Sequence, residues 1–171
     1  MNIANNLPRQ EIAAAESDCC PLIKPIDYDG TLFDFKDKMF VRVRTINFLH
    51  IPLNMSMVMR RAVRKISESD ADVDPEDYIM LSDEVSPWYS YHYIAVSDEV
   101  PGLKTQEISG KFLAKVFEGP FKDAEKWYEE LIDYTFASGY EPIKTLFYYT
   151  TCPKCAKKYG KNYVVGFEQV E

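Results

Sequence analysis

Residues 111–139 read KFLAKVFEGPFKDAEKWYEELIDYTFASG, and this stretch decides the fold because it joins a strand to the clearest helix of the chain. Apolar and polar side chains alternate over Lys111–Glu118, as they do in a half-buried strand. Gly119-Pro120 ends the strand. An apolar stripe at helical spacing follows over Phe121–Ala137, and Gly139 lies just past its end, where a left-handed cap is usual. The stretch therefore predicts a strand followed by an amphipathic helix.

The same pattern extends on both sides of this stretch. We expect two more strands after the helix, at Thr145–Thr151 and Asn162–Val170. The first half predicts a strand, a helix and two strands in the same order, at Met39–Phe48, from Asn54 onward, at Tyr78–Ser82 and at Trp88–Val96. The fold class is therefore α+β: a tandem β-α-β-β repeat in an antiparallel-rich sheet, with two helices on one face and a ligand cleft between the halves.

The repeat also sets the expected domain boundaries. Residues 1–37 contain Pro21, Pro25 and Gly30, and we expect an extended or mobile N-terminal segment there. One domain fills residues 38–171. Its first β-α-β-β unit is 38–102 and its second is 110–171.

Composition limits the classes of partner. The chain has 171 residues and a net charge of -7, which argues against binding nucleic acid. No apolar run approaches the length of a membrane helix, and Met1–Gln10 lacks the apolar core of a signal peptide, so we expect a cytoplasmic protein that binds no membrane. Aromatic residues make up 14% of the chain, which favours a small hydrophobic or aromatic ligand. We expect a monomer or a homodimer.

The cysteines allow three interpretations. Cys152 and Cys155 have the spacing of a metal knuckle or a redox dithiol. A zinc site needs four ligands, and the adjacent pair Cys19 and Cys20 does not easily imitate a second knuckle. The sequence therefore favours a structural turn with free thiols over metal binding or redox chemistry, and we predict no metal site and no cofactor.

Several aromatic side chains are candidates for a ligand pocket. Trp88, Tyr91 and Tyr93 lie on one predicted strand, with Trp88 facing opposite the tyrosines, and Tyr149 ends another strand. Trp127 lies on the apolar stripe of the second helix. The alternative is that these side chains fill the core.

Two carboxylates and one histidine are candidates for chemistry. Glu118 continues an apolar strand face, and partial desolvation there would make it a better general base. The alternative is a glutamate that turns into solvent at the end of its strand. Glu168 shares a face with Val164 and Gly166 and is a second candidate. A lone histidine such as His92 is more often a satisfied core residue than a catalyst.

The chain resembles the GyrI-like small-molecule-binding domain, which also serves as the effector-binding domain of BmrR-type regulators. The resemblance covers about residues 38–171 and rests on these segments: Phe117-Glu118-Gly119-Pro120-Phe121, Trp127, Ser138–Pro142, Tyr148–Cys155, and Trp88 with Ile94–Val96. Tyr148–Cys155 is similar to a subgroup of stand-alone members. The resemblance implies a cleft that takes bulky aromatic or cationic compounds, and some stand-alone members resemble hydrolases of cyclopropane-bearing alkylating toxins. Many regulator relatives have a buried glutamate in the strand after the second helix, whereas Lys144–Tyr149 contains no acid.

Three functions follow as expectations. The first is binding of bulky aromatic small molecules by Trp88, Tyr91, Tyr93, Glu118, Trp127 and Tyr149. The second is hydrolysis of strained alkylating toxins, with Glu118 as the base and Tyr149 as the tyrosine that supports the leaving side. The third is a tetrapyrrole carrier of the related SOUL type, for which only His50 and His92 offer axial nitrogen ligands.

Overall fold

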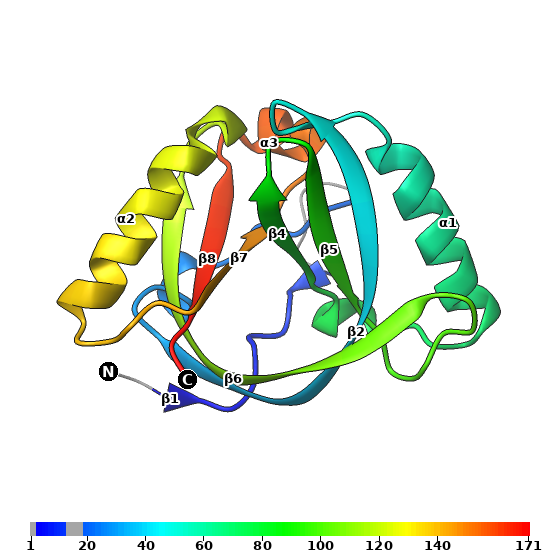
Figure 1. The fold of residues 1–171 in the computed structure, drawn as a ribbon, viewed down its shortest axis with the longest axis horizontal. Helices are drawn as coiled ribbons and strands as arrows, with labels where there is room; N and C mark the ends of the chain where they lie inside the picture. Colours follow the sequence, from blue (N-terminus) through cyan, green and yellow to red (C-terminus); the bar gives the residue numbers. More distant parts are fainter. Residues whose placement is uncertain (1–2, 13–18) are drawn as a thin grey trace. The chain divides into compact units, whose positions relative to one another are not determined.

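The computed structural model of the protein describes residues 3–12 and 19–171, so part of the predicted N-terminal segment lies outside the described residues (Figure 1). The chain divides into two compact units. Unit 1 holds residues up to 36, residues 75–77 and residues 110–171, and unit 2 holds residues 37–74 and 78–109. Two long strands, β2 (Leu32–Phe48) and β6 (Lys104–Glu118), contribute residues to both units.

Unit 2 is built around the strand β5 (Tyr89–Ala95), which pairs antiparallel with β2 on one side and with β4 (Met80–Ser86) on the other. A short strand, β3 (Ile51–Pro52), folds back on the end of β2. Helix α1 (Met55–Glu68) connects this hairpin to β4. Unit 2 is therefore a β-α-β-β unit in which the last strand lies between the first two.

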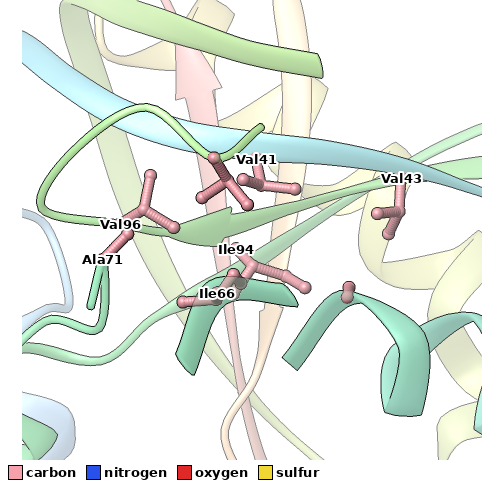
Figure 2. Close-up of a cluster of buried hydrophobic side chains, with 8 residues drawn as sticks. Val41, Val43, Ile66, Ala71, Ile94 and Val96 are labelled. Carbon is pink, nitrogen blue, oxygen red and sulfur yellow. The ribbon is translucent and has the colours of Figure 1, made fainter. Parts of the chain in front are cut away.

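Helix α1 covers one face of the unit 2 strands. Figure 2 shows the core side chains of this layer, in which Ile66 of α1 packs with Val41 of β2 and Ile94 of β5. Val41 and Ile94 are directly paired in the register of the two strands, so they share a face. Successive side chains of a strand point to opposite faces, so the residues directly before and after Val41 and Ile94 in the sequence have their side chains on the face opposite α1.

Unit 1 repeats this order. Its central strand β8 (Tyr163–Gln169) pairs antiparallel with β6 and with β7 (Lys144–Tyr149). Helix α2 (Ala124–Ala137) follows a 3-10 turn, η4 (Phe121–Asp123), and packs on β8 (Figure 1). The remaining elements are β1 (Ile3–Ala4), which pairs parallel with β2, the 3-10 turns η2 (Pro25–Asp27) and η3 (Pro75–Asp77), and helix α3 (Pro153–Tyr159).

The unit 1 strands bury apolar side chains on both faces. The face toward α2 contains Phe117, Phe147 and Val164, which pack with Trp127 and Leu131 of the helix. The opposite face contains a group of aromatic rings with neighbouring centroids 4.7–6.4 Å apart, namely Tyr28, Phe33, Phe35, Phe112 and Phe167. Edge and tilted contacts of this kind stabilise a core beyond the area that they bury.

The structure confirms the α+β class, and both units share the predicted order of elements. Two predicted boundaries were wrong. Strand β2 begins at Leu32 rather than Met39, and β6 begins at Lys104 rather than Lys111. The added part of β2 contains the buried Phe33 and Phe35 in a region that was expected to be extended or mobile, whereas the added part of β6 is mostly polar. The predicted Cys-Pro-Lys-Cys turn is the start of helix α3. Among the described residues, no helix is both long and apolar enough to cross a membrane.

Candidate functional site

An exposed aromatic surface lies on the strands of unit 2, on the face opposite α1. Arg44 is paired with Tyr91 and Ile46 with Tyr89 in the register of β2 and β5, so their side chains share this face. Phe48 continues it at the end of β2 by alternation. We call this surface the aromatic face, and it consists of Arg42, Arg44, Ile46, Phe48, Trp88, Tyr89 and Tyr91.

Two arginines lie over the tyrosine rings of the aromatic face. The Arg42 Cζ atom is 4.6 Å from the ring centroid of Tyr91, and the Arg44 Cζ atom is 4.5 Å from that of Tyr89. The two tyrosine rings meet edge to face with centroids 5.7 Å apart. Guanidinium groups at these distances are attracted by the ring quadrupoles. The aromatic face therefore carries two guanidinium groups beside its rings, and Asp83 of β4, which is paired with Tyr91, adds one carboxylate to the same face.

The hairpin tip of unit 2 adds exposed apolar side chains. Phe48 and Trp88 are 55% and 57% exposed, and their ring centroids are 6.2 Å apart. Main-chain hydrogen bonds fix this contact, since the Asn47 amide donates to the Trp88 carbonyl at 2.7 Å. Other exposed side chains of this tip are Ile46, Leu49, Ile51 and Leu53. Exposed apolar side chains gathered at one hairpin in this way are typical of a place where a ligand or partner binds.

The turn of this hairpin has an unusual backbone. Phe48 pairs with Ile51, so the loop has two residues, and both Leu49 (φ 49°) and His50 (φ 69°) have positive φ angles. Two-residue hairpins with positive φ at both positions normally use Asn-Gly or Asp-Gly. A leucine and a histidine there cost about 1–2 kcal/mol each, and such strain is concentrated at functional positions.

The predicted ligand contacts fall into an accessible and an inaccessible group. Trp88 and Tyr91 belong to the aromatic face, although Trp88 lies in the turn before β5 and not on the strand. Tyr93 is 2% exposed, and Trp127 is 4% exposed and stacked on Phe117 at 5.8 Å. Helix α2 buries the Trp127 indole against the strands of unit 1, as in the alternative that this side chain fills the core, and its contact with a ligand stays a prediction. Tyr149 is half-buried beside Phe121 and Phe147.

Glu118 does not have the surroundings that were expected of a base. The side chain is exposed at the end of β6, so the predicted partial desolvation is absent and the solvent-facing alternative is the observed one. Its neighbour Phe117 faces α2 together with Tyr149, so Glu118 points to the opposite face. Unit 1 therefore does not bring Glu118 and Tyr149 together as a catalytic pair.

Glu168 is the buried carboxylate of unit 1. It is 1% exposed, and the Thr145 hydroxyl donates a hydrogen bond to it. Burial raises its pKa, and hydrogen bonds from Thr145 and from the Ile143 and Lys144 amides offset part of this rise in pKa. These partners make Glu168 a satisfied structural carboxylate.

His92 lies in a buried polar network on the α1 side of unit 2. Its two ring nitrogens are 3.1 Å from the Thr45 hydroxyl oxygen and 2.9 Å from the Ser82 hydroxyl oxygen. Since the Thr45 hydroxyl donates to Asn47, Nε2 of His92 donates to Thr45, and Nδ1 accepts from Ser82. Burial lowers the pKa of His92 to about 4. The core interpretation of His92 is confirmed, and with both nitrogens engaged it offers no axial ligand for a tetrapyrrole.

Unit 1 also gathers the four cysteines. The sulfur atoms of Cys19, Cys20, Cys152 and Cys155 all lie within 4.8 Å of one another. The adjacent pair Cys19 and Cys20, which was not expected to imitate a second knuckle easily, therefore lies together with Cys152 and Cys155. Sequence reasoning missed the proximity of the four sulfurs because the local sequence pattern does not indicate that residues 19 and 20 lie beside helix α3 in the fold. We call this group the cysteine cluster.

Comparisons with known proteins identify a family from the sequence and similar folds among solved structures. A family model described as "Bacterial hydrolase" matches residues 10–170. The structure of SAV2435 bound to tetraphenylphosphonium has a TM-score of 0.50 and 14% identity, over 82% of this chain and 92% of that chain. An uncharacterized conserved protein from Listeria innocua has a TM-score of 0.62 and 11% identity, over 84% and 94%.

No curated protein matches the chain. At these identities, the two solved structures show a shared fold and nothing about activity. The family model spans nearly the whole sequence, and on that match the chain belongs to the bacterial hydrolase family.

Proposed function

We propose that this protein is a GyrI-like small-molecule-binding protein that takes bulky aromatic compounds on the aromatic face of unit 2. One observation carries the proposal: the exposed ring pair of Phe48 and Trp88 lies at the end of β2, the strand that also pairs with Tyr89 and Tyr91, whose half-buried rings meet edge to face. Flat apolar ligands gain most from surfaces that combine aromatic rings with a few fixed polar groups. The similar structure of SAV2435, which is bound to the bulky aromatic cation tetraphenylphosphonium, supports the ligand class.

The charge of the aromatic face refines the proposal. Arg42 and Arg44 each lie over a tyrosine ring, so a cationic ligand that approached these rings would meet two guanidinium groups against the single carboxylate of Asp83. At separations of a few ångströms on a protein surface, such a repulsion is worth about 1–4 kcal/mol. We therefore propose neutral or anionic aromatic compounds as the preferred class at this face.

A matched pair of ions tests this proposal. Tetraphenylborate and tetraphenylphosphonium have nearly the same shape and opposite charge, and calorimetric titration of each gives the affinity directly. We expect tetraphenylborate to bind more tightly, and Tyr91→Ala to weaken its binding by about five- to tenfold, equivalent to about 1–1.4 kcal/mol. Replacing both arginines with glutamine should remove the preference for the anion.

The control is Tyr128→Ala, which removes an exposed tyrosine from helix α2 in unit 1. Its affinity for both ions should equal that of the wild type. The proposal fails if neither ion binds with a saturable isotherm, or if Tyr91→Ala and Tyr128→Ala bind alike.

Hydrolysis is a second candidate, favoured by the description of the family to which residues 10–170 match. By its resemblance to stand-alone hydrolases, the substrate would be a cyclopropane-bearing alkylator. The water oxygen would bond to a strained ring carbon, the carbon–carbon bond would open toward an adjoining carbonyl group, and a carboxylate would take the water proton. Glu118 is the exposed carboxylate that the sequence nominates for this step.

A turnover assay with such an alkylator tests the second candidate. If Glu118 accepts the proton, Glu118→Gln should lower kcat by about 100-fold or more, which is the usual contribution of a general base. Glu129→Gln, which alters an exposed glutamate of α2, is the control and should keep the wild-type rate. Equal rates for wild type and Glu118→Gln would remove Glu118 from the mechanism, and no turnover by any variant would leave binding alone.

A further inference from the structure

The cysteine cluster is formed by two segments far apart in the sequence. Cys19 and Cys20 come from the N-terminal segment, Cys152 lies directly before α3, and Cys155 lies in its first turn. Exposure decreases across the cluster, from the exposed Cys19 to Cys155 at 2%. The sulfurs therefore converge at the edge of the unit 1 core.

The spacing of the sulfurs fits one metal ion better than a set of independent thiols. In a tetrahedral site with zinc–sulfur bonds of about 2.3 Å, neighbouring sulfurs are about 3.8 Å apart. All four sulfurs here lie within 4.8 Å of one another, and those of Cys19 and Cys20 are 3.5 Å apart. Shifts of about 1 Å or less would bring the set to zinc geometry.

Two further contacts hold Cys20 in place. The Cys152 backbone N–H donates to the Cys20 sulfur at 3.4 Å, and the Tyr159 hydroxyl donates to the Cys20 carbonyl at 2.5 Å. Hydrogen bonds of this kind around a metal site orient the ligands and stabilise thiolate charge. Tyr159 ends α3, so this short helix supplies Cys155 and also a hydroxyl group that positions Cys20, while Cys152 is its N-cap.

We propose that Cys19, Cys20, Cys152 and Cys155 bind one zinc ion, which joins the N-terminal segment to helix α3. Binding converts the four thiols to thiolates and releases their protons to solvent, with no change of oxidation state. Four thiolates complete the coordination of zinc, so the ion is structural and leaves no position for water or substrate. This role is independent of ligand binding at the aromatic face, whose residues all belong to unit 2.

Metal content and cobalt substitution test the site on the whole chain. The protein, purified without chelators, should contain about one zinc per chain. After exchange, Co²⁺ should give the intense visible d–d bands and the thiolate charge-transfer absorption of a tetrahedral sulfur site. Cys152→Ser should lose the bound zinc and weaken the cobalt spectrum, whereas His50→Asn, which changes an exposed histidine of unit 2, should leave both unchanged.

A second readout keeps the test valid if a cysteine variant folds poorly. An organomercurial reagent releases zinc from the wild-type chain, and hydrogen exchange followed by mass spectrometry then reports the segment that contains Cys19 and Cys20. Removal of zinc should speed exchange in that segment and in α3, while exchange in β5 of unit 2 stays the same. Wild-type protein that holds no zinc and does not bind cobalt through sulfur overturns the proposal, as does a disulfide or an iron centre at these cysteines.

Discussion

His92 is an imidazole surrounded by hydroxyl groups in the core of unit 2, and burial lowers its pKa to about 4. In the unfolded chain its pKa returns to about 6.5, so between these values the unfolded state binds the extra proton. Stability should therefore fall as the pH drops from about 6.5 to about 4, by about 2–3 kcal/mol from this residue.

Denaturation in urea at several pH values measures this effect. His92→Gln should be less stable than wild type at pH 7, and the gap in unfolding free energy should narrow toward pH 4. The control is His50→Asn at an exposed position, which should keep the pH dependence of the wild type. A gap for His92→Gln that is independent of pH would show that His92 is not buried in its neutral form.

Glu168 should give the opposite slope. Its pKa is raised by burial, so the folded state binds a proton more tightly than the unfolded state does. This contribution to stability is present below the ordinary glutamate pKa and is lost as the pH rises through the raised value. Glu168→Gln should therefore gain stability relative to wild type as the pH increases from about 4 to 8, measured by urea denaturation. An unchanged difference across that range would contradict this assignment.

Residue identity alone predicted these environments only in part. Glu118 and Glu168 both continue apolar strand faces in the sequence, but the end of β6 exposes the first, whereas the second is buried and accepts a hydrogen bond from Thr145 of β7. His92 was interpreted correctly because a lone histidine on a strand is more often a satisfied core residue than a catalyst. The hydroxyl partners Thr45 and Ser82 could not be predicted, since they depend on the register of three strands.

At the scale of elements, the β2–β3 hairpin combines strain with exposed apolar side chains. Leu49 and His50 have positive φ angles that asparagine and glycine adopt with less strain. The double variant Leu49→Asn/His50→Gly should therefore raise the free energy of unfolding by about 1–2 kcal/mol. It should also weaken tetraphenylborate binding if the tip belongs to the ligand surface. Loss of stability in the double variant would contradict the assigned backbone conformation.

The contact between α2 and β8 depends on the absence of a side chain at residue 166. A Cβ atom on Gly166 would lie 2.7 Å from Leu131 Cδ2 and 3.1 Å from Phe117 Cε2. Gly166→Ala should therefore destabilise the protein by about 1–3 kcal/mol. Adding Leu131→Ala should cost less in this background than in the wild type, because it removes the clashing atom.

A double-mutant cycle measured by thermal or urea denaturation gives this coupling. Glu129→Ala on the exposed side of α2 provides the control and should not couple to Gly166→Ala. Strict additivity of Gly166→Ala and Leu131→Ala would contradict the close approach of the helix to the strand.

Elements with a clear period were predicted well, and elements defined by distant contacts were not. The apolar stripe of α2 has the spacing of a helix, and α2 is found at Ala124–Ala137. The first residues of β6 show little alternation, and those of β2 directly follow a segment that contains Pro21, Pro25 and Gly30, so the start of each strand depends on pairing with neighbours elsewhere in the chain. The Cys-Pro-Lys-Cys segment was predicted as a turn, although it contains the start of helix α3. Pro153 is a favourable first residue for a helix, but the prediction did not use this local signal.

At the scale of the whole molecule, the chain is a repeated β-α-β-β unit with two specialised regions. In each unit the last strand pairs with both earlier strands, and a helix covers one face. Unit 2 presents the aromatic face, and unit 1 contains the cysteine cluster. The duplication was visible in the sequence because each unit has its own strand and helix periods. The cluster was not visible, because it depends on the N-terminal segment returning to α3.

The two tryptophans give the most direct test of the central claim, that aromatic compounds bind at the aromatic face of unit 2. Trp88 is 57% exposed on that face and Trp127 is 4% exposed in the core of unit 1, so their fluorescence reports separate places. Titration with tetraphenylborate should change the emission of the wild type in a saturable way, and Trp88→Phe should lose this change while keeping the Trp127 signal. A saturable change that persists in Trp88→Phe, or no change in the wild type, would contradict the account.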